Sequence, residues 1–102
     1  MATQDYTVRE NRQRPRIWIE GARLSNAGFT HHTPYTLDFA DDFIILKRCA
    51  ERCAEGARKV SGTPTRPIID LTGKSCGPFV TGDAVTIIYT DGVIMIYAEV
   101  ES

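Results

Sequence analysis

Residues 16–46, RIWIEGARLSNAGFTHHTPYTLDFADDFIIL, contain the pattern that decides the fold. They begin with a short β-rich run, RIWIE, that a glycine ends. Alternation places Ile17 and Ile19 on one face of this strand and Trp18 on the other. One helical turn is expected over 22–29, ARLSNAGF, because its apolar residues fall at helical spacing and its glycine can end the turn in a left-handed conformation.

The remainder of this stretch is typical of a β-hairpin. Apolar and polar side chains alternate over 35–39, YTLDF, as in a half-buried strand. Asp41-Asp42 fits a two-residue turn, and 43–46, FIIL, is the returning strand. Strand, helical turn and hairpin therefore form one structural unit over 16–46.

A second, altered copy of the unit follows within residues 67–102. After Phe29 and Phe79 the two segments align at a constant offset of fifty residues. The matched positions are Tyr35 with Val85, Leu37 with Ile87, Phe39 with Tyr89, Asp41-Asp42 with Asp91-Gly92, Ile44 with Ile94, and Leu46 with Ile96. The second copy is two residues shorter between its glycine and its phenylalanine. The alignment predicts an internal duplication.

A unit this short cannot bury its own apolar face, whereas two units can close one small core. We therefore expect a single domain over 1–102, mostly β (α+β), built as a pseudo-two-fold β-barrel with a bridging helix. Its parts are a loose N-terminal arm (1–15), the first unit (16–46), a helix and linker (47–66) and the second unit (67–102). The helix is expected over 47–60, KRCAERCAEGARKV, because small apolar residues recur there at helical spacing.

Composition limits the possible classes of protein. The 102 residues are 42% hydrophobic and 25% charged, which argues against disorder. No apolar run is long enough to cross a bilayer, and the polar N-terminus does not resemble a secretory signal. Three cysteines without CxxC spacing suit a reducing, cytoplasmic location. The net charge of −1 excludes a strongly basic nucleic-acid binder.

The positive charge is nevertheless concentrated in the two segments outside the units. Residues 1–16 carry a net charge of +2 and residues 47–60 carry +3, whereas 17–46 and 61–102 carry −3 each. A basic patch of this kind can follow a phosphate backbone. The candidate phosphate contacts are Arg12, Arg14, Arg16, Arg48 and Arg52, and we expect them to form one continuous patch.

Candidate catalytic and metal-binding groups are sparse. His31-His32 lies in a connector, and an extended backbone would point the two rings to opposite sides. The three cysteines, Cys49, Cys53 and Cys76, are expected to be small buried hydrophobic residues. Turn formation explains the acidic residues Asp38, Asp41 and Asp42 without a metal ion. Catalytic residues therefore stay unknown, and no metal and no cofactor are expected.

The first unit resembles the SymE toxin family, small bacterial proteins with the AbrB-like swapped-hairpin fold. The resemblance covers about residues 6–48 and is carried by Arg16-Ile17-Trp18-Ile19-Glu20-Gly21, Leu24, Ala27-Gly28-Phe29, Tyr35-Thr36-Leu37 and Phe43-Ile44-Ile45-Leu46, with Tyr6-Thr7-Val8 before them. The chain departs from the family at Arg23, where a Trp is usual, and at His32, where a Gly is usual. The second copy has that Gly, as Gly82, but lacks the AGF motif.

This resemblance implies a cytoplasmic toxin or regulator, bacterial or phage-encoded, that acts on RNA or DNA. If the protein is an enzyme, the resemblance implies an endoribonuclease, although the sequence favours binding over cleavage. The alternative is a small non-enzymatic interaction protein, such as a mobile-element-encoded inhibitor or an antitoxin that blocks a protein partner. We expect no membrane association and a monomer or weak homodimer.

Overall fold

The computed structural model describes residues 2–49 and 57–99 of the chain. Their secondary structure is almost entirely β, with two short helical turns. The elements are β1 (Ala2–Thr7), β2 (Arg9–Asn11), β3 (Arg14–Glu20), α1 (Ala22–Asn26), β4 (Pro34–Phe39), β5 (Phe43–Arg48), β6 (Arg58–Lys59), β7 (Ser61–Thr63), β8 (Arg66–Thr72), η1 (Gly73–Cys76), β9 (Ala84–Thr90) and β10 (Val93–Ala98).

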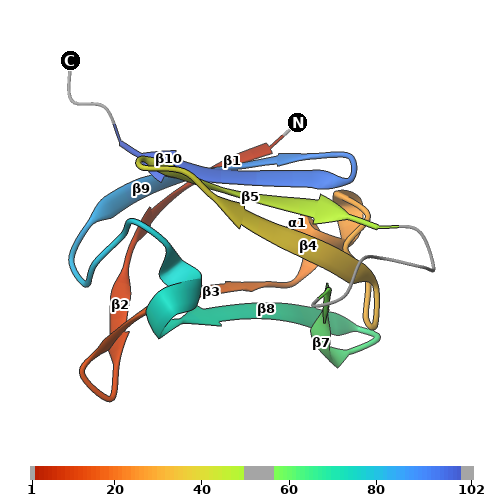
Figure 1. Cartoon of the computed structure of the whole chain (residues 1–102). Helices are drawn as coiled ribbons and strands as arrows, with labels where there is room; N and C mark the ends of the chain where they lie inside the picture. The colour runs from red at the N-terminus through yellow and green to blue at the C-terminus, as the bar shows by residue number, and fades with distance from the viewer. Residues whose placement is uncertain (1, 50–56, 100–102) are drawn as a thin grey trace.

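The strands of the described residues form two antiparallel sheets that lie one above the other (Figure 1). The larger sheet, called sheet A here, has the order β1-β9-β10-β5-β4-β6. The smaller one, sheet B, has the order β2-β3-β8-β7. Each sheet therefore contains strands from both halves of the chain, and neither half forms a sheet by itself.

The strand pairing has pseudo-two-fold symmetry. In sheet B, Ile17 lies opposite Leu71 and Ile19 lies opposite Ile69, which places the symmetry axis at the Trp18–Asp70 pair. In sheet A, the corresponding axis position is the pair Ile45–Met95, with the two strands β5 and β10 antiparallel across it. Two copies of one unit that interleave around an axis produce this arrangement.

The two helical turns occupy equivalent places and differ in length. In the first half, α1 buries Leu24 completely, and Gly28 follows it with φ 87°. In the second half the chain is two residues shorter, and a 3-10 turn, η1, buries Cys76 in the equivalent position. Burial raises the pKa of the Cys76 thiol, so this cysteine is an inert core residue. The shortening therefore replaced an α-helical turn by a tighter one.

The hydrophobic core fills the space between the sheets. Apolar residues of both sheets point into it at alternate positions, as the 2-residue period predicts. The buried residues are Ile17, Ile19, Ile69 and Leu71 from sheet B, Tyr35, Ile44, Leu46, Val85, Ile87, Tyr89, Ile94 and Ile96 from sheet A, Leu24, Ala27, Phe29, Cys76 and Phe79 from the turns at the two ends, and Val8 and Val60 between strands. No polar or charged residue is buried among the described residues. The core is therefore packed mainly from apolar side chains.

The predicted closed barrel is wrong, because the two sheets are open and do not pair with each other among the described strands. The chain crosses from sheet A to sheet B at Val8, and again at Val60, and both side chains are buried. The Val8 amide donates to the Asp83 carbonyl and the Val60 amide donates to the Thr33 carbonyl. These two corners bond to loops instead of to strands, which interrupts the ladder that a barrel would need.

The predicted loose N-terminal arm is also wrong. Strand β1 pairs with β9 from Ala2 to Thr7, and β2 forms a hairpin with β3. The Tyr89 hydroxyl donates to Gln4 Oε1 at 2.6 Å, and burial raises the pKa of Tyr89 to about 12. This polar segment is ordered because it pairs with strands that lie far away along the chain. The composition of the segment does not indicate this pairing.

The predicted bridging helix is contradicted at both of its ends. Lys47 and Arg48 belong to β5, whereas residues 58–59 and 61–63 belong to β6 and β7. The middle of the expected helix, 50–56, lies outside the described residues. Val60, expected on a helical stripe, is buried at a corner between two strands, because strand pairing with β4 and β8 overrides the local helical pattern. No helix in the described part of the chain has the length and apolarity needed to cross a membrane.

We expect Ile94→Ala to lower the free energy of unfolding by about 3 kcal/mol, because the side chain is fully buried between the sheets. The pseudo-equivalent variant Ile44→Ala is expected to cost a similar amount. Ile45→Ala is the matched control on the outer face of the same strand and is expected to cost about 1 kcal/mol. Urea denaturation measures all three. Equal losses for Ile94→Ala and Ile45→Ala would contradict this core.

Candidate functional site

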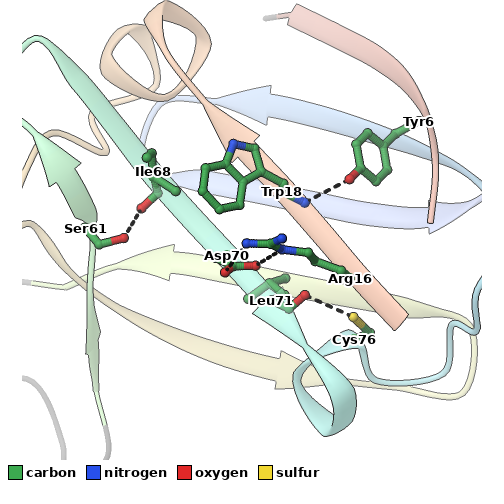
Figure 2. A network of polar contacts seen from close by, with 8 residues as sticks. All are labelled: Tyr6, Arg16, Trp18, Ser61, Ile68, Asp70, Leu71 and Cys76. Carbon is green, nitrogen blue, oxygen red and sulfur yellow. Dashed lines mark hydrogen bonds and ion pairs between the residues drawn. The ribbon is translucent and has the colours of Figure 1, made fainter. Parts of the chain in front are cut away.

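The outer face of sheet B carries a cluster of charged and aromatic residues. Because Ile17 and Ile19 point into the core, the alternate residues Arg16, Trp18 and Glu20 of β3 point outward. Two ion pairs link them to β8. Arg16 Nε and Nη2 each lie 3.0 Å from the Asp70 carboxylate oxygens. Figure 2 shows the Arg16 guanidinium lying between Trp18 and Asp70.

The second ion pair joins the far end of β3 to the start of β8. Arg66 Nη2 lies 2.8 Å from Glu20 Oε1, and Arg66 Nε lies 3.1 Å from Glu20 Oε2. The hydrogen bond from Arg66 lowers the pKa of Glu20, and the hydrogen bond to Asp70 raises the pKa of Arg16. Both bidentate pairs fix the side chains that surround Trp18.

Trp18 is held in place from two sides. Its backbone N–H donates to the Tyr6 hydroxyl at 3.0 Å, where β3 extends beyond the end of β2 (Figure 2). The Arg16 guanidinium carbon lies 4.5 Å from the centre of the indole ring, in cation–π contact. Tyr6 in turn lies beneath Arg9, whose guanidinium carbon is 5.9 Å from the ring centre. Residues of sheet A and sheet B thus fix one half-exposed tryptophan.

A groove opens between β1 and this part of β3. Its volume is about 770 Å³. It is lined by Gln4, Asp5, Tyr6, Thr7, Arg9, Trp18, Glu20 and Arg23. A second hollow of about 440 Å³ adjoins it and shares Arg9, Trp18 and Glu20. We call the first hollow the Trp18 groove.

Two of the charged side chains that line the Trp18 groove without an ion pair are arginines. Glu20 is already neutralised by Arg66. Arg9 and Arg23 form no ion pair within 4 Å among the described residues, and both are exposed. Asp5 is the one other charged residue of the lining. The groove therefore offers an aromatic surface with two available cations.

The β2–β3 hairpin extends the positive charge beyond the groove. Arg9, Arg12 and Arg14 are exposed on it, and we call this element the basic hairpin. Arg14 lies over Gly73 at the start of η1, close to the exposed Lys74. The pseudo-equivalent hairpin, β7–β8, has the sequence SGTPTR, and its single arginine is paired with Glu20. The two hairpins therefore share a backbone arrangement but differ in charge.

The five arginines predicted as one patch do not come together. Arg12 and Arg14 lie on the basic hairpin, whereas Arg16 is engaged by Asp70. Arg48 ends β5, and Figure 1 shows that point and the β2–β3 hairpin on opposite sides of the molecule. There Arg48 Nη1 lies 3.3 Å from Asp91 Oδ1. Arg52 lies outside the described residues.

The two histidines lie side by side, contrary to expectation. Their ring centroids are 3.7 Å apart, because His32 adopts a left-handed backbone conformation with φ 69° and the segment is not extended. The pseudo-equivalent residue is Gly82, with φ 95°, which explains why a glycine suits this position. The His32 amide donates to the Val60 carbonyl, so the turn braces a corner of the fold.

The remaining candidates do not form a metal site. Asp38, Asp41 and Asp42 are exposed at the β4–β5 turn, and Cys76 is buried far along the chain from them. Over residues 2–49 and 57–99, no group of three or more His, Cys, Asp or Glu side chains could hold a metal ion. Cys53 lies outside this part of the chain.

Comparisons with protein-family models, with curated proteins and with solved structures found no match to this chain. The site is therefore defined by its own geometry.

Sequence reasoning missed the Trp18 groove. The alternation that buries Ile17 and Ile19 already placed Trp18 on the outer face, and a large aromatic residue there was the available signal. Tyr6, Arg9 and Arg23 could not be added, because they come from β1, β2 and α1 and meet Trp18 only in the folded protein.

We expect Tyr6→Phe to lower the free energy of unfolding by about 1 kcal/mol, because the Trp18 N–H loses its hydrogen-bond acceptor. Trp18 is the single tryptophan of the chain, so its fluorescence emission is also expected to shift. Tyr97→Phe, on the outer face of sheet A, is the matched control. Urea denaturation followed by fluorescence measures both variants, and identical behaviour of the two would contradict the role of Tyr6.

Proposed function

We propose that the protein is a small nucleic-acid-binding protein, a toxin or regulator of the SymE-like kind, whose binding surface is the basic hairpin together with the Trp18 groove. The observation that carries this proposal is the asymmetry between the two hairpins. A duplicated scaffold has three exposed arginines on one hairpin, whereas the equivalent hairpin has one arginine, which is already paired.

Exposed arginines on a protruding two-stranded ribbon suit contacts with phosphates. A ribbon of this width can follow a groove or a strand of nucleic acid, and each phosphate contact releases condensed counterions. Arg12 is at the tip of the hairpin with φ 54°, and Gln13 beside it has φ 67°. Figure 1 shows that the β2–β3 hairpin projects beyond the rest of sheet B, where a nucleic-acid backbone can reach it.

The resemblance of residues 6–48 to the SymE family supports the same proposal, including the AbrB-like swapped-hairpin fold. In such a fold, hairpins of two units interleave, and strands from both halves of this chain lie side by side in sheets A and B. The proposal is one of binding.

We expect the double variant Arg12→Gln/Arg14→Gln to weaken binding to short RNA and DNA, because two phosphate contacts are lost. The logarithm of affinity should fall less steeply with salt, with a slope that is smaller by about 2. Fluorescence anisotropy of labelled strands across a salt series measures this slope.

Arg48→Gln is the matched control for that experiment, since Arg48 is an arginine on the other side of the molecule. Its affinity and salt slope should equal those of the wild type. An equal loss in Arg48→Gln would contradict the basic hairpin as the binding surface, and a shallow salt slope in the wild type would contradict the proposed function.

A different observation favours a second candidate function, a small interaction protein such as an inhibitor or antitoxin that blocks a protein partner. The outer face of sheet A has an apolar centre, whereas an uncovered sheet face is usually polar. Ile88, Met95 and Ile45 lie in one row across β9, β10 and β5, and each is half-exposed. Phe43 and Tyr97 form the next row and border a hollow of about 310 Å³.

For this second function we expect Met95→Glu to abolish capture of a protein partner from a cell lysate, because a charge would be buried at the centre of the apolar rows. Thr36→Glu, which adds the same charge on β4 of the same sheet, is the control and should keep the partner. Binding of nucleic acid should be unchanged in both variants. A partner retained by Met95→Glu would exclude this face.

A further inference from the structure

We propose that the Trp18 groove accepts one unpaired base of a single-stranded nucleic acid, stacked on the indole ring, with its phosphate held by Arg9 and Arg23. This inference rests on the proposed function and adds a subsite that selects single strands over duplexes. Without this subsite, the basic hairpin would contact the phosphates of single strands and of duplexes alike.

The size and lining of the groove fit one nucleotide unit. Small-molecule sites typically have volumes of a few hundred to about a thousand Å³, and the groove measures about 770 Å³. A nucleotide combines a flat aromatic ring with an anionic group. The lining combines the indole of Trp18 with Arg9 and Arg23, and no carboxylate of the described residues forms an ion pair with either arginine.

The aromatic surface is held in position before any ligand binds. Asp70 fixes Arg16, and Arg16 lies against the indole ring (Figure 2). The Tyr6 hydroxyl accepts from the backbone N–H of Trp18, which fixes the stretch of β3 that carries the ring. A fixed ring loses little conformational entropy when a base stacks on it, which favours affinity. Stacking on aromatic side chains tolerates any base, because every base has a π-face.

Polar groups for the edge of a base are also present. The Gln4 amide oxygen accepts from Tyr89, so its amide nitrogen is the group that faces a ligand. Asp5 also borders the groove. A base paired in a duplex could not use these groups, because its own partner occupies the edge that they would contact.

The second half of the molecule lacks this subsite. The pseudo-equivalent of Trp18 is Asp70, which lies directly opposite it across the symmetry axis. By the same alignment, Arg58 stands in place of Tyr6 and Ser61 in place of Arg9. The scaffold therefore provides one base pocket, and a bound strand should leave that pocket along the basic hairpin of the same half.

Trp18 fluorescence gives a direct test, because it is the single tryptophan of the chain. The full-length protein is titrated with a short poly-adenylate strand, the same strand with abasic sites, and a duplex of equal length, each as RNA and as DNA. We expect the intact single strands to quench Trp18 and to bind about tenfold more tightly than the duplex. The abasic strand should bind without quenching.

Two variants separate the pocket from the hairpin. Trp18→Leu should reduce the preference for single strands over the duplex about tenfold, as measured by anisotropy with both forms. Phe39→Leu is the matched control, because Phe39 is an aromatic residue that is 48% exposed on β4, away from the groove, and it should keep the preference. Thermal unfolding followed by circular dichroism verifies that both variants fold. If Trp18→Leu does not fold, Trp18→Phe, which keeps an aromatic ring, is used in its place.

The outcomes distinguish this inference from the proposed function. If single strands and duplexes bind equally and Trp18 is not quenched, the pocket is wrong although nucleic-acid binding stands. If no strand binds at low salt, the proposed function fails, and adenosine monophosphate is then titrated alone. Quenching by this nucleotide, but not by ribose 5-phosphate, would support a base pocket without a nucleic-acid function, and its absence would overturn the pocket.

Discussion

The pairing of β3 with β8 and of β5 with β10 is the interaction on which the rest of the structure depends. It joins the two halves of the chain in both sheets, with Trp18 opposite Asp70 and Ile45 opposite Met95. Neither half has enough apolar surface to bury by itself, so each completes the core of the other. The same pairing sets the inward positions of the core residues, and therefore also decides which side chains face solvent.

The two halves of the chain are alike in their core positions and differ at their surfaces. The core positions of the two halves remain equivalent, since both must be apolar and fill the same space between the sheets. The outer positions are under no such constraint and differ. The first half presents Trp18 and the basic hairpin, whereas the second half contributes Asp70, which positions Arg16 against the indole ring. The residues proposed to contact a ligand thus come from the first half, and a residue of the second half positions them.

The expectations that failed share one physical origin. The N-terminal segment is polar and lacks a periodic pattern, yet pairing with β9 orders it as an edge strand. The segment around Val60 has helical spacing, yet its corner position and pairing with β4 and β8 make it extended. The closed barrel failed because Val8 and Val60 bond to loops at the two corners. In each case contacts from distant parts of the chain outweigh a local preference that is worth less than about 1 kcal/mol per residue.

The sequence by itself determined the strands of the two units, their hairpins, the left-handed glycine after the first helical turn and nearly all of the core, because periodicity and turn chemistry are local properties. It also showed that the two units match at a fixed offset, which implies that their core positions are equivalent. The tertiary structure alone decided the openness of the sheets and the separation of Arg48 from the basic hairpin. It also decided the assembly of the Trp18 groove from β1, β2, β3 and α1. These features depend on which strands pair across long stretches of chain, and no pattern within one segment encodes that choice.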